Sequence, residues 1–257
     1  MKQSYAVITG ASSGIGREFA KQLALKGYPL ILVARREQRL VQLCKELEEY
    51  YHVKAGYICA DVSKEEECYR VLKELEKVPV ELFINNAGFG DCGTYETTAL
   101  EKELEMTNVN IKAVQIFSKG ILNRFVKENR GYLLNVASSA GLLPAGPYMA
   151  AYYASKSYVV SFTRAIAFEL KQKHSRVYVG ALCPGPVHTE FNSVANVRFA
   201  LKGMKVTECV REACRQMQKK KIIIVPGRAL QAATLFSKLI PVSLQLPMIA
   251  RQQKKKV

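Results

Sequence analysis

The chain has 257 residues, of which 49% are hydrophobic and 23% charged, a composition that favours a folded globular protein over a disordered or fibrous one. Its seven cysteines form no CxxC pair and its three histidines are isolated, so we expect neither a disulfide framework nor a metal site. The net charge of +16 would suit nucleic acid or an anionic surface. However, basic and acidic residues alternate along Arg35–Glu49 and Lys64–Lys77, which is typical of a solvated surface. We therefore expect no nucleic-acid partner.

No segment of the sequence predicts a leader peptide or a membrane span. The apolar run Tyr5–Ile8 is too short for the hydrophobic part of a signal peptide, and no uncharged run approaches the length of a span. We expect a cytoplasmic protein without an integral membrane segment. The apolar segment Leu230–Ile249 is interrupted by Lys238, Gln245 and two prolines, so weak peripheral contact with a membrane surface or a partner stays open.

Short β-branched runs alternate with helical stretches, which indicates right-handed βαβ crossovers and an α/β fold with a parallel sheet covered on both faces. Strands are predicted at Tyr5–Thr9, Leu30–Ala34, Ala55–Cys59, Val80–Ile84, Tyr132–Val136, Arg176–Leu182 and Lys221–Val225. Helices are predicted at Ile15–Lys26, Glu37–Tyr50, Lys64–Leu75, Leu100–Lys127, Ala151–Lys171 and Thr207–Lys219. No repeat or linker divides the chain, so we expect one domain over residues 1–257. Residues 190–205 fit the periodicity poorly and are predicted to form a mobile substrate lid, and residues 228–257 a variable C-terminal segment.

A glycine-rich turn follows the first strand and opens the first helix. Glycine is needed where the chain turns tightly, where the backbone approaches a phosphate and where a helix packs on a strand. The amides at the N-terminus of the new helix would face a pyrophosphate. The turn therefore predicts a dinucleotide site, with cofactor-binding residues Gly10, Ser12, Ser13, Gly14, Ile15 and Gly16.

The end of the second strand predicts which dinucleotide is bound. An acid at this place binds the ribose hydroxyls of NAD, whereas an arginine accommodates the 2′-phosphate of NADP. The strand ends in Val33-Ala34 and continues with Arg35 and Arg36, with no acid, and Arg17 follows the glycine turn. Guanidinium groups bind a phosphate dianion favourably, so we predict NADP(H) as the cofactor.

A tyrosine and a lysine lie four residues apart at the start of a long predicted helix. Residues at this spacing share a helical face, so Tyr152 and Lys156 can point together into one cleft. A free tyrosine has a pKa of about 10, which is high for acid–base chemistry at neutral pH. A nearby ammonium favours the phenolate, and the pair therefore predicts a catalytic acid or base. Tyr153 has Ser157 at the same spacing, which cannot supply this charge.

These motifs, in this order, resemble those of the short-chain dehydrogenase/reductase family, in the branch of ketoreductases and hydroxysteroid dehydrogenases. The resemblance covers roughly Tyr5–Phe191. It implies a Rossmann-type doubly wound parallel sheet of about seven strands in the order 3-2-1-4-5-6-7. It also implies a homodimer or homotetramer built through the helices Leu100–Lys127 and Ala151–Lys171. In the family, the tyrosine exchanges a proton with the substrate oxygen and the lysine binds the ribose and lowers the tyrosine pKa.

Three further segments match the family's cofactor site. The first follows the third strand and meets the adenine, the second is the NNAG motif after the fourth strand, and the third follows the sixth strand and holds the nicotinamide carboxamide. The cofactor-binding residues that the resemblance implies are Asp61, Val62, Asn86, Ala87, Gly88, Pro184, Gly185, Val187 and Thr189, together with Tyr152 and Lys156.

Two catalytic assignments have a neighbouring alternative. The family's serine, which polarises the substrate carbonyl, matches Ser138 by the SxxG pattern and Ser139 by the spacing to the tyrosine. We favour Ser138, because the register of the strand determines it and an extra loop residue costs little. The asparagine that the family uses in a proton relay with Lys156 and water matches Asn110, with Asn108 as the alternative.

The sequence as a whole predicts an oxidoreductase that transfers a hydride between NADP(H) and a carbonyl or secondary alcohol. The expected cleft is apolar, which suggests a hydrophobic substrate such as a steroid, a fatty acyl compound or an aromatic ketone. The alternative is a non-catalytic NADP-binding sensor or scaffold. The apolar residues assigned to the lid are Phe191, Val194, Val197, Phe199, Leu201 and Met204, and those assigned to the opposite side are Leu142, Leu143 and Met149.

Overall fold

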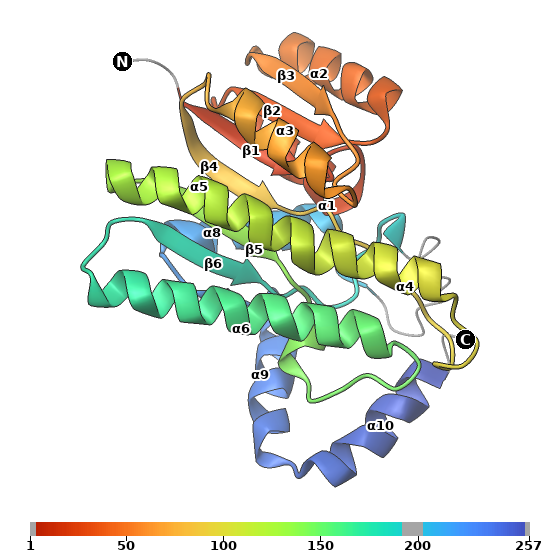
Figure 1. Cartoon of the computed structure of the whole chain (residues 1–257). Helices are drawn as coiled ribbons and strands as arrows, with labels where there is room; N and C mark the ends of the chain where they lie inside the picture. Colours follow the sequence, from red (N-terminus) through yellow and green to blue (C-terminus); the bar gives the residue numbers. More distant parts are fainter. Residues whose placement is uncertain (1–3, 192–202, 255–257) are drawn as a thin grey trace.

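The computed structural model describes residues 4–191 and 203–254, and its centre is one parallel sheet of seven strands (Figure 1). The strand order is β3-β2-β1-β4-β5-β6-β7 and every neighbouring pair is parallel. This confirms the predicted Rossmann-type sheet and its order. The strands are β1 Tyr5–Thr9, β2 Leu30–Ala34, β3 Ala55–Cys59, β4 Val80–Asn85, β5 Tyr132–Val136, β6 Tyr178–Leu182 and β7 Ile223–Ile224.

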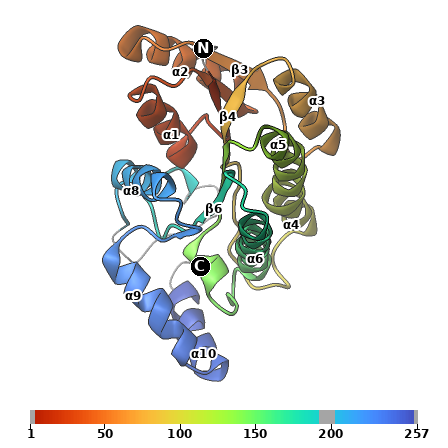
Figure 2. The same ribbon diagram turned by 90° about the vertical axis from the view of Figure 1, so that its left-hand side faces the viewer.

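Helices cover both faces of the sheet (Figure 2). One face packs against α1 (Gly14–Ala24), α2 (Glu37–Tyr51) and α8 (Val206–Gln218) through a core that includes Phe19, Leu43 and Val210. The other face packs against α3 (Glu65–Leu75), α5 (Val114–Glu128) and α6 (Ala150–Gln172) through Val71, Phe117 and Leu170. Burial of two apolar faces explains why the central strands are almost entirely apolar rather than alternating.

The last two strands are shorter than predicted. The predicted strand Arg176–Leu182 begins at Tyr178, because the Arg176 amide bonds to the Asn129 side chain instead of to a neighbouring strand. The predicted strand Lys221–Val225 is reduced to Ile223–Ile224, which pairs with β6 at two positions on the edge of the sheet. An edge strand has a neighbour on one side only, so its length depends on local pairing and not on its apolar pattern.

The predicted helix Leu100–Lys127 contains a π-helical segment, η1, over Asn108–Ala113. It separates α4 (Leu100–Thr107) from α5. Such a segment inserts one residue into the helical repeat and is often found at functional sites. Here it turns Asn110, which is fully buried, toward α6 and the loop after β4.

The chain ends in two helices that the sequence analysis left as a variable segment. Helix α9 (Arg228–Phe236), the short 3₁₀ turn η3 (Ser237–Leu239) and α10 (Val242–Lys254) form a hairpin that projects from the β6–β7 side of the molecule (Figures 1 and 2). Among the described residues, no helix combines the length and apolar character needed to cross a membrane.

Candidate functional site

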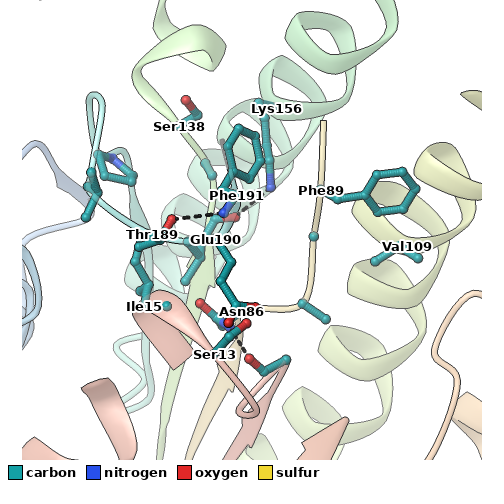
Figure 3. Close-up of a pocket in the computed structure, with 18 of the residues that line it drawn as sticks. Ser13, Ile15, Asn86, Phe89, Val109, Ser138, Lys156, Thr189, Glu190 and Phe191 are labelled. Atoms are coloured by element: carbon teal, nitrogen blue, oxygen red, sulfur yellow. Dashed lines mark hydrogen bonds between the residues drawn. The ribbon is translucent and has the colours of Figure 1, made fainter. Parts of the chain in front are cut away.

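A cavity of about 390 Å³ lies at the carboxyl ends of the strands, where open α/β sheets bind ligands. The predicted cofactor and catalytic residues come together here from the ends of β1, β2, β3, β4, β5 and β6 and from α6 (Figure 3). Every residue predicted for the cofactor site lines the cavity except Gly16, and every predicted catalytic residue does so except Asn110. Gly16 and Asn110 lie directly behind its wall.

The glycine turn is held in a conformation that other residues rarely adopt. Gly10 and Gly14 have φ values of +65° and +53°, and a side chain on Gly16 would collide with the Gly10 carbonyl and the Asn86 amide. Asn86 donates hydrogen bonds from Nδ2 to the carbonyls of Thr9 (2.9 Å) and Gly10 (3.2 Å). The NNAG segment therefore fixes the shape of the turn.

A cluster of arginines and hydroxyls lies at one end of the cavity. Arg36 donates hydrogen bonds to Oγ of Ser12 (3.0 Å) and of Ser13 (2.7 Å). Its guanidinium also forms an ion pair with Glu190 at 2.9 Å. Arg39 joins Glu190 at 2.7 Å, so two arginines share one carboxylate. These two arginines hold the pKa of Glu190 below its usual range, chiefly through their hydrogen bonds, and the carboxylate is charged at neutral pH.

The other basic side chains named from the sequence make different contacts. Arg35 lines the cavity but pairs with Glu105 at 2.8 Å and lies 4.0 Å from Asp61. Arg17, which the sequence placed after the glycine turn as a further phosphate ligand, instead pairs with Glu46 on α2. Asp61 accepts hydrogen bonds from the amide and the hydroxyl of Ser63, which shapes the turn after β3.

Tyr152, Lys156 and Ser138 lie together at the other end of the cavity, and all three side chains are buried. The Lys156 ammonium is 5.9 Å from the centre of the Tyr152 ring and donates a hydrogen bond to the Val136 carbonyl at 3.0 Å. Ser138 accepts a hydrogen bond from the Ala140 amide and forms a side-chain hydrogen bond with Tyr152. Ser139 lies in the short helix η2 (Ser139–Leu142), and its amide donates to the Pro184 carbonyl.

Burial dominates the ionisation of this group. It raises the pKa of Tyr152 to about 12, although the hydrogen bond with Ser138 acts in the opposite direction. It also lowers the pKa of Lys156 to about 8. The sequence led us to expect a lowered tyrosine pKa, whereas the structure raises it, because removal from water disfavours the phenolate more strongly than the polar neighbours favour it.

Asn110 connects the NNAG loop to helix α6. Its Oδ1 accepts from the Phe89 amide (3.1 Å), and its Nδ2 donates to the Phe89 carbonyl (2.9 Å) and to Ser155 Oγ (3.0 Å). A side chain on Gly88 would come within 3.1 Å of Lys156 Nζ and 2.9 Å of Asn110 Oδ1, so Gly88 leaves the space in which both groups lie. Asn108 is only partly buried and lines no part of the cavity.

The segment after β6 closes the cavity from the side of the predicted lid. Val187 pairs with Met204 in an isolated bridge, which joins the two described ends of that region. Thr189 lies beside the glycine turn, since a Cβ on Gly14 would be 3.2 Å from its side chain. Val194, Val197, Phe199 and Leu201 lie outside the described residues.

The end of the cavity beside Tyr152 is apolar. Met149, Tyr153, Ala140 and Phe191 line it, and the Phe191 and Tyr152 rings lie 5.5 Å apart. Met149 and Phe191 were predicted for this cleft and line it. Leu143 packs against the cluster that contains Met149 and Tyr152 without lining the cavity, and Leu142 packs against a different cluster.

Sequence reasoning missed Tyr153, Arg39 and Glu190 as residues of the site. Tyr153 was not predicted because the residue four positions after it is Ser157 and not a lysine. Arg39 follows the paired arginines by one helical turn, and that spacing could have indicated it. No sequence signal links Glu190 to the arginines, because it lies more than 150 positions away along the chain.

Comparison with protein families and curated proteins places the chain among known sequences. The short chain dehydrogenase family matches residues 4–198. A very-long-chain 3-oxoacyl-CoA reductase of Anas platyrhynchos is 32% identical over 201 residues, which cover 76% of this chain and 64% of the relative. An inactive hydroxysteroid dehydrogenase-like protein 1 of Homo sapiens is 33% identical over 75% of this chain and 58% of its own length. The chain thus spans less than two thirds of the length of these relatives.

Solved structures match over nearly the whole chain. A short-chain dehydrogenase from Sphingobium yanoikuyae in complex with NADPH is 28% identical, with a TM-score of 0.84, and the match covers 92% of this chain and 93% of that one. A short chain dehydrogenase/reductase from Burkholderia phymatum in complex with NAD is 25% identical, also with a TM-score of 0.84, over 96% and 97% of the two chains. The two complexes contain different dinucleotides.

Proposed function

Because the chain belongs to the short chain dehydrogenase family, we propose that it is an NADP(H)-dependent oxidoreductase acting on a hydrophobic carbonyl compound or the corresponding secondary alcohol. The observation that carries this proposal is the meeting of Tyr152, Lys156 and Ser138 in the same cavity as the glycine turn. A buried phenol beside a hydroxyl and an amine is a set of groups suited to proton transfer.

The residues around the glycine turn fit a dinucleotide phosphate. The positive φ values of Gly10 and Gly14 bring backbone amides to the start of α1, where a helix N-terminus favours an anion. At the adenosine end, Arg36 with Ser12 and Ser13 offers donors for a 2′-phosphate, and no acid follows β2 directly. When bound, the nicotinamide supplies the hydride, which is the chemistry that no side chain provides.

The Tyr152 phenol carries the proton that reduction of a carbonyl requires. With a pKa of about 12 the phenol keeps its proton at neutral pH, so it can donate that proton to the substrate oxygen. Ser138, hydrogen-bonded to the phenol, is positioned to donate to the same oxygen as charge develops on it. Lys156, with a pKa of about 8, stays largely protonated at neutral pH and stabilises negative charge beside the ring.

Asn110 acts as a positioning residue in this proposal. Its three hydrogen bonds hold the loop after β4 against α6, the helix that carries Tyr152 and Lys156. The side-chain amide of Asn110 is therefore hydrogen-bonded to Phe89 and Ser155, and it does not contact the reacting atoms.

The apolar end of the cavity supports a hydrophobic substrate. Met149, Tyr153 and Phe191 would surround a carbonyl held at Tyr152. Among the described residues that line that end, the basic side chain is Lys156, which donates its hydrogen bond to the Val136 carbonyl. A steroid, a fatty acyl compound or an aromatic ketone fits this description. The name of one relative, a 3-oxoacyl-CoA reductase, supports the fatty acyl class.

The test is NADPH oxidation with ketones of graded size, run in parallel with NADH. We expect activity with apolar ketones and a preference for NADPH. Tyr152→Phe should lower kcat by about a hundredfold or more, because the general acid is lost, while NADPH still binds. Tyr158→Phe, at a partly buried tyrosine on the same helix whose hydroxyl donates to Gln115 outside the cavity, is the matched control and should retain activity. Activity that survives Tyr152→Phe would refute the catalytic assignment, and a preference for NADH would refute the cofactor assignment.

A second candidate function is a non-catalytic NADP-binding sensor or scaffold. It is favoured by the relative named as inactive. The same measurements separate the two functions, because a sensor would bind NADPH without oxidising it in the presence of any ketone of the series, and Tyr152→Phe would then change nothing.

A further inference from the structure

The positive charge of the chain is concentrated at its C-terminal end. No Asp or Glu follows Glu212, whereas ten Lys and Arg residues do. Lysines and arginines are interleaved with acids in the helices Glu37–Tyr51 and Glu65–Leu75, whereas the last 45 residues combine ten basic residues with no acid. Among its described basic residues, Arg228, Lys238, Arg251 and Lys254 are exposed on the hairpin of α9, η3 and α10, called here the C-terminal hairpin.

The same hairpin exposes large apolar side chains around its turn. Leu239 is 79% exposed in η3, and Phe236, at the end of α9, is 63% exposed. The other exposed apolar side chains of the hairpin are Leu235, Ile240, Val242, Leu244 and Met248. Single exposed apolar residues need no explanation, but a group of this size on one projecting element marks an interaction surface. Figures 1 and 2 show this turn at the end of the molecule away from β3.

Hydrogen bonds within the hairpin hold its turn together, although the apolar side chains there are exposed. The buried Gln245 side chain donates hydrogen bonds to the carbonyls of Ser237 (2.8 Å) and Ile240 (2.7 Å). Ser237 Oγ donates to the Thr234 carbonyl at 3.0 Å. Polar groups that would resist burial are thus paired within the hairpin, and its apolar side chains can enter an apolar phase without leaving these carbonyls unsatisfied.

An apolar surface of this kind could bind a second copy of the chain or a lipid bilayer, and the charge of the hairpin distinguishes between them. A second copy of the chain would bring its own acid-free hairpin against this one in a symmetric contact, and the like charges would repel. An anionic lipid surface has the opposite charge and also accepts apolar side chains, and lysines such as Lys238 can extend to its headgroups.

We propose that the C-terminal hairpin docks the protein on the surface of an anionic lipid bilayer, with Phe236, Leu239 and their apolar neighbours inserted below the headgroups. The hairpin also adjoins the apolar end of the cavity. Ile249 of α10 packs in one cluster with Met149 and Tyr152, and the Gln253 amide donates a hydrogen bond to the Tyr153 phenol. A docked hairpin would therefore hold the substrate end of the cavity at the bilayer, a consequence that rests on the proposed function.

The test is the binding of the full chain to vesicles, without cofactor or substrate. We expect it to bind vesicles that contain phosphatidylglycerol, to bind pure phosphatidylcholine vesicles much more weakly, and to be released by salt. Leu239→Glu should weaken binding to anionic vesicles by on the order of tenfold to a hundredfold, because a buried leucine is lost and a negative charge is added. Leu25→Glu makes the same charge change at a residue that is 72% exposed at the end of α1, and it should bind like the wild type.

Three outcomes would overturn the proposal. The first is no binding of the wild type to anionic vesicles, and the second is equal weakening by Leu25→Glu and Leu239→Glu, which would indicate charge alone. The third is a wild type that does not bind vesicles and whose molar mass falls on Leu239→Glu. That result would show that a second copy of the chain binds to the hairpin. NADPH oxidation with a water-soluble ketone, measured on the same preparations, reports the proposed function separately, so failure of one leaves the other standing.

Discussion

Glu190 joins the predicted lid to the cofactor end of the cavity by its ion pairs with Arg36 and Arg39. Arg36 is also the residue that we propose for the 2′-phosphate, so the carboxylate and the phosphate would compete for one guanidinium. The three side chains are between 44% and 48% exposed, and ion pairs of that exposure contribute little each. Competition between Glu190 and a 2′-phosphate for Arg36 would therefore change the affinity for the cofactor more than the stability of the fold.

We expect Glu190→Gln to tighten the binding of NADPH by about threefold to tenfold, because two exposed ion pairs no longer have to be broken. Binding of NADH, which lacks the 2′-phosphate, should change little. Dissociation constants measured by titration calorimetry check this. Glu46→Gln breaks the ion pair with Arg17 away from the cavity and is the matched control. Weaker NADPH binding by Glu190→Gln would mean that the carboxylate supports the site instead of competing for it.

Lys156 is buried at a cost in stability. Burial lowers its folded-state pKa from 10.5 to about 8, so the unfolded chain binds more protons between these values. Stability therefore rises with pH across that interval, and the full cost applies below about pH 8.

We expect Lys156→Met to abolish carbonyl reduction and to gain stability relative to the wild type near pH 7. This gain should shrink by about 2 kcal/mol between about pH 7 and about pH 9.5. Free energies of unfolding from urea titrations at both pH values check it. A pH-independent difference between the two proteins would show that Lys156 is not buried as a charged group.

At the scale of elements, Thr9 joins the ends of β1 and β4. Its Oγ1 accepts hydrogen bonds from the amides of Asn86 (2.9 Å) and Ala87 (3.0 Å), and the side chain is buried. The NNAG motif is therefore both a structural turn and part of the cavity wall. The same connection fixes the glycine turn, since Asn86 in turn donates to the carbonyls of Thr9 and Gly10.

We expect Thr9→Val to lower the free energy of unfolding by about 2–4 kcal/mol, because it leaves two partly buried amides without their acceptor. Cofactor affinity should fall with it. Thr163→Val removes one acceptor, used by the Asn135 side chain, at an equally buried place and should cost about half as much. Chemical denaturation measures the free energy of unfolding of both variants. An equal loss of stability in the two variants would contradict the role given to Thr9.

The π-helical segment η1 shows where helical periodicity fails as a guide. The apolar repeat that starts at Leu100 predicts one helix. The structure has a continuous helical stretch there, but the segment Asn108–Ala113 contains one extra residue. The contacts of Asn110 with Phe89 and Ser155 come from two other elements, so they favour the insertion only after those elements have packed.

At the scale of the molecule, helices α4 and α6 expose apolar side chains on one face. Phe168 is 61% exposed on α6 and Leu104 is 55% exposed on α4. Family resemblance predicts that these helices build a dimer or tetramer, and an exposed phenylalanine is of the kind that interfaces bury. This face is separate from the C-terminal hairpin, so self-association and lipid binding would use different surfaces.

We expect Phe168→Glu to convert an oligomer into a smaller species with unchanged secondary structure, because a charge replaces an aromatic side chain at the interface. Light scattering coupled to size-exclusion chromatography measures the molar mass. Tyr50→Glu, at a residue 74% exposed on α2, is the control and should leave the mass unchanged. A monomeric wild type would refute the interface.

The order of strands and helices follows from the sequence alone, and so do the glycine turn, the NNAG segment and the spacing of Tyr152 and Lys156. These features depend on residues within one turn or one strand, where local periodicity and steric limits decide the conformation. For the same reason Ser138 and Ser139 remained alternatives, because neighbouring residues share every local signal, and only the packing of α6 against β5 brings the Ser138 hydroxyl to Tyr152.

Only the tertiary structure decided which charges meet, how far the phenol is removed from water and which apolar side chains stay outside. Glu190 reaches Arg36 and Arg39 across the fold, Tyr152 has its pKa raised by residues from several elements, and the C-terminal hairpin keeps Leu239 exposed. Each of these depends on burial or on pairs far apart in the chain. Local sequence patterns do not encode such distances, because they result from the packing of whole elements against one another.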